Sequence, residues 1–288
     1  MNDLILMGPG VTPDLICDLA DDVQAADLRT RPQAARFCSL SPMTARMIVR
    51  RFENDADVDA VVVPAGLSIK DFRVLCLDMD GTLIHNECID DMAALAGVGE
   101  AVAAVTKAAM EGHQTFAESL EKRVGLLKDA PRTIIDDAMK GIRLQPGAPA
   151  LIRFCREHGV KSYILSGGFT QFTKVVAERL GMNGAFSNEL GLDGERLTGG
   201  VTGPAGGRIL DADGKRRTLE ILCALDGVPT SAAIAAGDGA NDLEMLGAAG
   251  LGVAYHAKPL VRSRAAHAIG AVGLDGLTLL FVEAWPNA

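Results

Sequence analysis

Residues 73–82 read RVLCLDMDGT, and this stretch decides the fold. Residues 73–77 are a short run, mostly Val and Leu, which is typical of a strand buried on both faces of a parallel sheet. Two carboxylates, Asp78 and Asp80, follow directly after this run. Because ligands of open α/β sheets bind at the carboxyl ends of the strands, the stretch predicts a functional site as well as a strand.

The pattern repeats downstream. We expect strands over 160–165, 232–236 and 251–254, with helices over 148–158, 170–180, 218–225 and 242–249. Such alternation predicts an α/β fold with a Rossmann-like, mostly parallel sheet and helices on both faces. Residues 86–145 interrupt it with helical patterns alone, at 90–95, 101–110, 116–127 and 131–139. We interpret this segment as a helical cap inserted after the first strand.

Residues 1–70 differ from the rest of the chain. They predict a small α+β domain with strands over 4–7 and 58–63 and helices over 13–21 and 41–52. Residues 64–70, which begin with Pro-Ala-Gly, resemble a linker to a core domain at 71–288. The polar residues of the small domain form no constellation, so the sequence assigns no chemistry to it.

Composition excludes several classes of function. The 288 residues carry a formal charge of −9, which argues against a nucleic-acid partner, since binding to nucleic acid needs a basic surface. No apolar stretch approaches the length of a membrane span, so we expect no membrane partner. The six cysteines are scattered without metal-ligand spacing, and we expect a cytoplasmic location.

Two more polar clusters follow strands, SGGF at 166–169 and GDGAND at 237–242. Taken alone, Asp-x-Asp is as compatible with a solvated turn, and Ser166 with a helix N-cap. The second cluster offers the oxygen ligands that Mg²⁺ prefers. Three clusters at one sheet edge together indicate metal-assisted phosphoryl transfer, with one carboxylate to attack and another to handle protons.

Phosphoryl transfer also needs a cationic side chain near the transferring oxygens. Lys215, just before the expected helix at 218–225, is the best placed candidate. Arg208, Arg216 and Arg217 compete with it, and spacing alone does not choose among the four.

This series of motifs resembles the haloacid dehalogenase superfamily and, within it, the bacterial phosphoserine phosphatase family. The resemblance covers roughly residues 72–270. It rests on DMDGTLI at 78–84, ECID at 87–90, AMEG at 109–112, FAESLEKRV at 116–124, SGGFT at 166–170, GDGANDLEML at 237–246 and AGLGVAYHAKP at 249–259.

The resemblance implies a role for each motif residue. Asp78 is the implied nucleophile, which forms an aspartyl-phosphate, and Asp80 the implied acid and base. The implied Mg²⁺ ligands are Asp78, the main-chain carbonyl of Asp80, Asp238 and Asp242. The implied phosphate-binding groups are Ser166, Gly167, Lys215 and Asn241; the family's spacing favours Lys215 over the neighbouring arginines.

Substrate choice is implied to come from the cap. Glu87 matches a family residue that binds the substrate ammonium, and Arg123 matches one that binds its carboxylate, while Met110 and Phe116 wall the pocket. Simpler interpretations stay open: Glu87 as a first-turn helix acid, Arg123 paired with Glu118 or Glu121, and Met110 and Phe116 as cap core.

The implied activity is Mg²⁺-dependent hydrolysis of phosphoserine, the last step of L-serine biosynthesis. The open alternatives are another small phosphate as substrate, transfer of the phosphoryl group to an alcohol, and a binding module that senses phosphoserine. Some relatives carry an ACT-like regulatory or dimerising domain ahead of the core. A degenerate ACT-like domain at 1–70, and a homodimer formed through it, therefore stay open as well.

Overall fold

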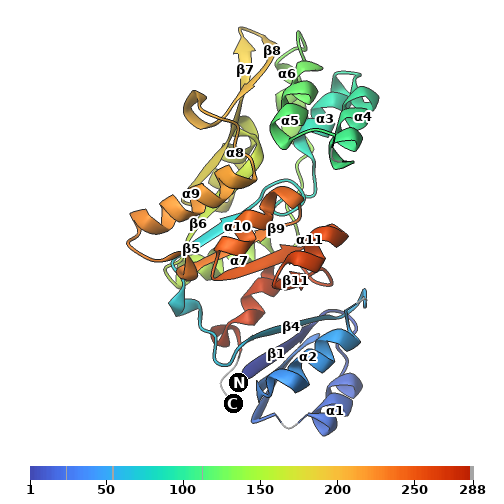
Figure 1. Cartoon of the computed structure of the whole chain (residues 1–288), viewed down its shortest axis with the longest axis vertical. Coiled ribbons are helices and arrows are strands. Elements are labelled where there is room, and N and C mark those ends of the chain that lie inside the picture. Colours follow the sequence, from blue (N-terminus) through green and yellow to red (C-terminus); the bar gives the residue numbers. More distant parts are fainter. Residues whose placement is uncertain (24, 54, 112, 286–288) are drawn as a thin grey trace.

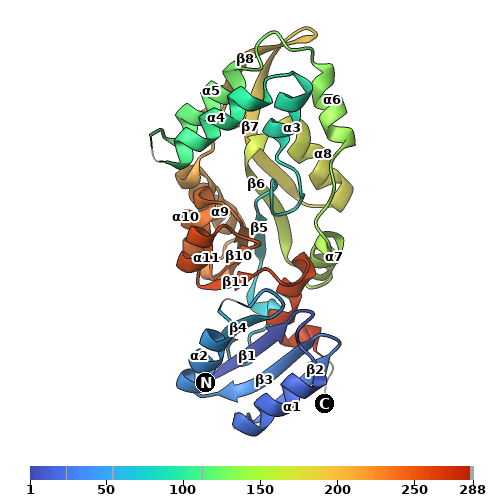
Figure 2. The ribbon, with the colours of Figure 1, turned by 90° about the vertical axis from the view of Figure 1, so that its right-hand side faces the viewer.

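The computed structural model describes residues 1–23, 25–53, 55–111 and 113–285. Three parts follow one another along the long axis of the molecule: a small N-terminal domain, a central α/β core, and a cap at the far end (Figures 1 and 2). The chain leaves the last strand of the small domain at Pro64 and enters the first core strand at Val74.

The core is a seven-stranded sheet in the order β11-β10-β9-β5-β6-β7-β8, parallel except for the antiparallel pair β7–β8. The strand β5 lies in the middle, between β9 and β6, so the three strands that carry the polar clusters are neighbours. The strands are β5 (Val74–Leu77), β6 (Lys161–Phe169), β7 (Gly184–Asp193), β8 (Arg196–Thr202), β9 (Ala233–Gly237), β10 (Leu251–Tyr255) and β11 (His267–Ile269).

Side chains of β5 alternate between two hydrophobic cores, which explains its continuous apolar run. Val74 and Cys76 pack with residues of one helical layer, and Leu75 and Leu77 with residues of the opposite layer. The first layer contains α9 (Ala212–Leu225), α10 (Leu243–Ala248) and α11 (Pro259–Arg264); the second contains α7 (Ala148–Glu157) and α8 (Thr170–Leu180). The prediction of a parallel sheet with helices on both faces is confirmed.

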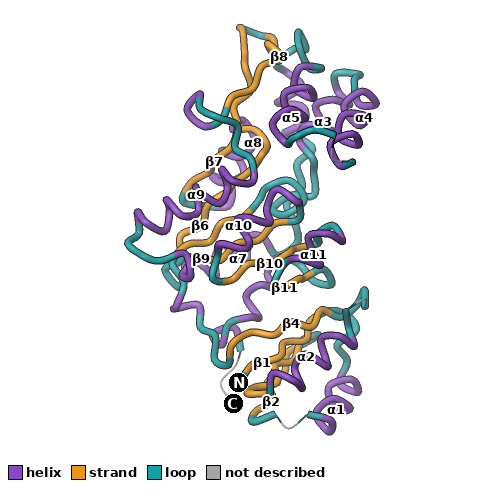
Figure 3. Tube along the Cα trace, viewed as in Figure 1, coloured by secondary structure: helices purple, strands orange, loops and turns teal. Residues whose placement is uncertain are grey.

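The cap consists of four helices, α3 (Cys88–Leu95), α4 (Gly99–Met110), α5 (Phe116–Gly125) and α6 (Thr133–Lys140). Teal loops join it to the core in Figure 3, and the β7–β8 hairpin rises beside it. Backbone hydrogen bonds tie that hairpin to the loop between α5 and α6, from Asp129 N–H to the Leu197 carbonyl (2.9 Å) and from Arg132 N–H to the Glu195 carbonyl (2.8 Å).

The sequence prediction for the core was incomplete. Strands β7, β8 and β11 and helix α11 were missed, and α9 begins at Ala212 rather than at residue 218, so Lys215 lies inside that helix. The segment SGGF belongs to the end of β6. The earlier start of α9 comes from turn chemistry: Asp211 caps the helix by accepting a hydrogen bond from Gly214 N–H (2.9 Å), so the helix begins before its apolar pattern.

The N-terminal domain has the order βαββαβ and one antiparallel sheet, β2-β3-β1-β4, the ferredoxin-like arrangement. Its predicted helices and two of its strands are confirmed, but β2 and β3 were missed. Its elements are β1 (Asn2–Met7), α1 (Pro13–Asp22), β2 (Asp27–Arg31), β3 (Ala34–Leu40), α2 (Pro42–Arg51) and β4 (Asp59–Pro64).

The N-terminal sheet is buried on both faces. Leu4 and Leu6 face its own helices, whereas Ile5 and Met7 join the hydrophobic core of the central domain. Arg36 on β3 is 0% exposed; its Nε and Nη2 donate to Asp3 Oδ2 at 3.0 and 2.7 Å, and its Nη1 donates to the Leu280 carbonyl at 3.1 Å. The ion pair lies within the small domain, and the hydrogen bond to Leu280 links that domain to the C-terminal segment of the core.

We expect Arg36→Met to lower the free energy of unfolding by about 3 kcal/mol or more, because it leaves the Asp3 carboxylate buried without a cation. Chemical denaturation measures the change. Arg29→Met is the matched control, since Arg29 pairs with Asp27 on the more exposed strand β2 and its loss costs about 1 kcal/mol or less. Equal unfolding midpoints for the two variants would contradict the stabilising role of the buried Arg36–Asp3 pair.

Candidate active site

Three carboxylates meet at the carboxyl edge of the sheet. Asp78 follows β5, while Asp238 and Asp242 follow β9, and oxygens of all three lie within 4.8 Å of one another. Close packing demands glycine nearby: Gly81 has φ +73°, and a Cβ there would lie 2.8 Å from the Asp238 carboxylate. Glycine at position 81 therefore leaves the room that the Asp238 carboxylate occupies.

Lys215 lies beneath this cluster and is 0% exposed. Its Nζ is 2.9 Å from Asp78 Oδ2 and 2.6 Å from Asp242 Oδ1. Burial opposes its charge, but Asp242 and Asp78 outweigh burial and raise the pKa of Lys215 above its usual value. The rival candidates lie elsewhere: Arg208 and Arg217 are exposed, and Arg216 pairs with Asp213 and Glu220.

The cluster carries more negative charge than Lys215 offsets. Burial, followed by Asp242, raises the pKa of Asp78, with Lys215 acting in the opposite direction. Burial and Asp242 also raise the pKa of Asp238, whose carboxylate accepts a hydrogen bond from Thr82 Oγ1 (3.2 Å). Three buried, crowded carboxylates of this kind fit a hard divalent cation such as Mg²⁺, which takes oxygen ligands.

Ser166 and Gly167 lie opposite the carboxylates, at the end of β6. Ser166 Oγ accepts a hydrogen bond from Gly168 N–H at 2.9 Å, and the Gly167 carbonyl accepts one from Asn188 Nδ2 at 2.9 Å. Asn188 is 0% exposed, and its Oδ1 accepts from Leu210 N–H (2.7 Å), just before α9. The buried side-chain amide of Asn188 thus links Gly167, at the end of β6, to Leu210, which lies just before α9, the helix that carries Lys215.

Asp80 has the environment of a proton donor. Burial, and next the nearby Glu87 carboxylate, raise the pKa of Asp80 to about 7, so it holds a proton for part of the time at neutral pH. Its carboxylate accepts hydrogen bonds from Cys88 Sγ (3.2 Å) and Cys88 N–H (3.4 Å). Burial and Asp80 also raise the pKa of Cys88, which disfavours the thiolate that a cysteine nucleophile needs.

The cap supplies the opposite wall of the site. Glu87 is the N-cap residue of α3 but makes no capping hydrogen bond through its side chain, which leaves its carboxylate available to the cavity. Arg123 Nε donates to the Ser119 carbonyl at 3.3 Å. Glu118, an alternative partner for Arg123, instead closes a capping box with Thr115.

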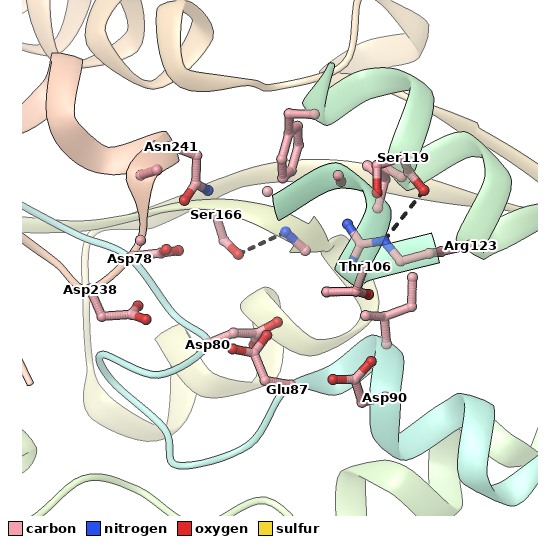
Figure 4. A pocket seen from close by; sticks show the side chains of 18 of the residues that line it. Asp78, Asp80, Glu87, Asp90, Thr106, Ser119, Arg123, Ser166, Asp238 and Asn241 are labelled. Atoms are coloured by element: carbon pink, nitrogen blue, oxygen red, sulfur yellow. Dashed lines mark hydrogen bonds between the residues drawn. The ribbon is translucent and has the colours of Figure 1, made fainter. Parts of the chain in front are cut away.

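Core and cap enclose a cavity of about 580 Å³. Figure 4 shows Asp78, Asp238 and Ser166 on the core side, with Arg123 on the cap side. Of the predicted residues, Lys215 and Asp242 lie behind this lining, and the side chain of Met110 is outside the described part of the structure. Those that line the cavity are Asp78, Asp80, Glu87, Phe116, Arg123, Ser166, Gly167, Asp238 and Asn241.

Sequence reasoning missed several residues of this cavity. Asp90, Thr106, Gln114 and Ser119 of the cap and Lys258 of the core also line it. Lys258 lies inside the quoted motif AGLGVAYHAKP, which could have drawn attention to it. The cap residues belong to helical patterns whose orientation toward the core only the tertiary structure reveals.

An acidic cluster at the carboxyl edge of a parallel sheet, covered by a helical cap, is typical of capped Rossmann-like enzymes that transfer phosphoryl groups with the help of a divalent cation. The model of the haloacid dehalogenase-like hydrolases matches residues 72–250. The chain belongs to this family and, within it, to the phosphoserine phosphatases.

Relatives from several bacteria carry that name. A Streptomyces coelicolor phosphoserine phosphatase is 46% identical over 225 residues, which cover 78% of this chain and 53% of the relative. One from Polaromonas sp. is 44% identical over 218 residues, 75% of this chain and 92% of the relative. This chain thus spans about half the length of the first and nearly all of the second.

The fold also matches solved structures through both domains. The unliganded structure of a probable phosphoserine phosphatase from Vibrio cholerae is similar, with a TM-score of 0.80 and 34% identity over 98% of this chain and 87% of that one.

In the described part of this chain, no helix is both long and apolar enough to cross a membrane.

Proposed function

We propose that the chain hydrolyses O-phospho-L-serine to L-serine and phosphate, with Mg²⁺ as cofactor, as the last step of L-serine biosynthesis. The supporting observation is a single cavity that holds a nucleophile, a proton donor and two groups complementary to an amino acid. Asp78 and Asp80 lie on its core side, and Glu87 and Arg123 belong to the cap. A site for generic phosphates needs no such pair of opposite charges in its cap.

In the first step, Asp78 attacks phosphorus, an Asp78 O–P bond forms, and the bond from phosphorus to the serine oxygen breaks. The leaving oxygen takes the proton of Asp80, whose raised pKa keeps that proton available near neutral pH. In the second step, water attacks the aspartyl-phosphate and gives its proton to Asp80, which restores both carboxyl groups and releases phosphate.

Groups around Asp78 would stabilise the charge of the transferring phosphoryl group. Ser166 and the Gly167 amide would bind phosphoryl oxygens and Asn241 would close the site, while Lys215 would add positive charge beneath Asp78. Asp78, the Asp80 main-chain carbonyl, Asp238 and Asp242 would hold Mg²⁺. When bound, this ion acts as a Lewis acid on the phosphoryl oxygens.

The cap would select the substrate. The Glu87 carboxylate is complementary to an ammonium, and the Arg123 guanidinium offers two parallel hydrogen bonds to a carboxylate. Phe116 of the cap packs directly against the backbone of Gly167, because its ring lies 2.5 Å from the position that a Cβ on Gly167 would take. Any side chain at Gly167 would therefore collide with the cap.

Arg123→Ala tests this assignment. We expect the KM for phosphoserine to rise about 10- to 100-fold, since a hydrogen bond to a charged group contributes about 1.5–3 kcal/mol. The KM for p-nitrophenyl phosphate, which has no carboxylate, should change by less than about threefold. Lys122→Ala is the control on the same helix, because Lys122 is exposed and does not line the cavity. Equal rises for both substrates would remove Arg123 from substrate recognition.

A further inference from the structure

Lys258 brings a positive charge to the cavity from the core side. It is the residue before α11, it lines the cavity, and its side chain is exposed. Its N–H donates to the Asp238 carbonyl at 3.3 Å, so its backbone lies beside one of the three clustered carboxylates. Burial raises the pKa of Glu87 and of Asp90, and the charge of Lys258 opposes this rise in both. Its ammonium therefore acts on acids of the cap as well as on the core.

The cavity has few positive charges for an anionic ligand. Among the described residues, its lining holds five carboxyl groups but only two cationic side chains, Arg123 of the cap and Lys258 of the core. A phosphate ester carries a charge of about −1.5 to −2 near neutral pH. The field of a cleft acts on a charged ligand before contact and raises its local concentration. An exposed cation on the core side is therefore placed to attract this ligand.

The loop that carries Lys258 depends on a neighbouring segment, residues 269–272, which begins at the end of β11. His256 has φ +44°, a backbone conformation that a non-glycine residue holds only when its surroundings fix it. Its N–H donates to the Ile269 carbonyl at 2.8 Å, and its Nε2 donates to the Val272 carbonyl at 3.1 Å. The conformation of the loop is thus held from this segment.

One carboxylate of the small domain contacts both supports of this loop. Asp59, the first residue of β4, is 2% exposed. Its Oδ2 accepts hydrogen bonds from Gly270 N–H (2.8 Å) and Ala271 N–H (2.7 Å), in the segment that holds the loop. Its Oδ1 lies 3.6 Å from Arg262 Nη2 on α11, and Arg262 N–H donates to the Lys258 carbonyl at 3.0 Å. In Figures 1 and 2, β4 is the strand of the small domain that lies nearest β11.

We propose that Lys258 is a further substrate-binding residue that attracts the phosphate group, and that Asp59 of the small domain is its positioning residue. The inference rests on the proposed function only in that the ligand is a phosphate ester. Phosphate rather than carboxylate follows from the position of Lys258, whose N–H is bonded to the Asp238 carbonyl, whereas Arg123 belongs to the cap. The small domain thus contributes to substrate binding without touching the substrate.

Lys258→Met tests the binding role. We expect the KM to rise about three- to tenfold for both phosphoserine and p-nitrophenyl phosphate, with kcat changed by less than about twofold, because a charge at the rim acts on binding. Added salt should raise the KM of the wild type more than that of the variant, since salt screens the lost charge. Lys258→Arg keeps the charge and should keep the wild-type KM. Arg264→Met is the matched control, because Arg264 is an exposed cation of α11 that does not line the cavity.

Asp59→Asn tests the positioning role. The amide keeps the shape of the carboxylate but loses the charge that faces Arg262. We expect the KM for both esters to rise about twofold or more, up to the increase in Lys258→Met. The double variant should have the KM of Lys258→Met alone, because both changes act through one side chain. A merely structural Asp59 would change stability without this non-additivity.

Asp57→Asn is the control for Asp59, since Asp57 is exposed and lies two residues earlier in the chain. It should leave the KM for both esters unchanged. Thermal unfolding of each variant sets an assay temperature at which all of them are folded. If Asp59→Asn does not fold, Arg262→Met provides the same comparison, because it removes the other partner of the pair on α11.

An unchanged KM in Lys258→Met would overturn the inference. A rise for phosphoserine alone would overturn it too, by placing Lys258 on the substrate carboxylate. Additive increases of KM in the double variant, or a loss of kcat alone in Asp59→Asn, would overturn the role of Asp59. The proposed function fails in a different experiment: a wild type that does not prefer phosphoserine to 3-phosphooxypropionate, which keeps the carboxylate and lacks the amine, refutes it.

Discussion

We expect Asp78→Asn to release phosphate from phosphoserine at least about 10³-fold more slowly than the wild type, because the amide that replaces the carboxylate is a far weaker nucleophile. The other acids near Asp78 have different proposed roles: Asp80 transfers protons, and Asp238 and Asp242 would hold Mg²⁺. Asp242 is paired with Lys215 behind the cavity lining, and the Cys88 thiol has a raised pKa. Steady-state phosphate release in saturating Mg²⁺ measures the loss.

The fold of the Asp78→Asn variant should survive. Burial and the Asp242 carboxylate raise the pKa of Asp78, which means that its charged form is disfavoured in the folded protein. Asparagine removes that unfavourable charge, and Lys215 keeps Asp242 as a partner (2.6 Å). The thermal unfolding midpoint should therefore not fall. Turnover near the wild-type rate in a folded variant would contradict the assignment of the nucleophile.

Lys215→Met is expected to damage both activity and stability. Loss of a positive charge near the transferring oxygens should lower kcat by about 10²- to 10³-fold. The variant also leaves Asp78 and Asp242 buried without the cation that pairs both, which should lower the free energy of unfolding by about 3–5 kcal/mol. Denaturation in a chelator measures the loss of stability, and added Mg²⁺ should recover part of it.

Acid should also rescue this variant. Removal of Lys215 raises the pKa of Asp78 further, and a carboxyl whose folded-state pKa lies above its unfolded value destabilises the protein as pH rises through that range. The stability difference from wild type should therefore shrink as the pH is lowered. Arg216→Met is the control: Arg216 is the next residue, pairs with Asp213 and Glu220 near the surface, and should cost about 1 kcal/mol or less. Equal losses for the two variants would contradict the role of Lys215.

Much of the core and its site could be predicted from the sequence because the signals are local. A parallel strand buried on both faces is a continuous apolar run, and RVLCL shows it directly. The polar clusters follow such strands within a few residues, so their meeting at one sheet edge needs only the α/β topology. These rules placed Asp78, Ser166 and Asp238 together, and the structure agrees.

The missed strands β3 and β7 contain polar residues that local sequence rules assign to the protein surface. In β3, Arg36 interrupts the apolar pattern and is buried only because Asp3, 33 residues away, accepts its hydrogen bonds. In β7, Ser187 and Asn188 are buried by partners from β6, α8 and the approach to α9. Such long-range pairing leaves no trace in a short window of sequence.

The cap side of the site shows the same limit. Glu87 and Arg123 were predicted only through resemblance, since helical periodicity does not say which face of the cap meets the core. Gln114 and Lys258 line the cavity from loops, where no periodicity exists to guide a prediction. The roles assigned to the site residues, and the ACT-like nature of residues 1–70, stay predictions.

Phosphate release from a panel of phosphomonoesters, with and without Mg²⁺, tests the central claim most directly. The panel should include phosphoserine, O-phosphoethanolamine, 3-phosphooxypropionate and p-nitrophenyl phosphate. The account predicts the highest kcat/KM for phosphoserine, no turnover in a chelator, and recovery when Mg²⁺ is restored. A flat profile across the panel, or phosphoserine turnover that a chelator leaves unchanged, would contradict it.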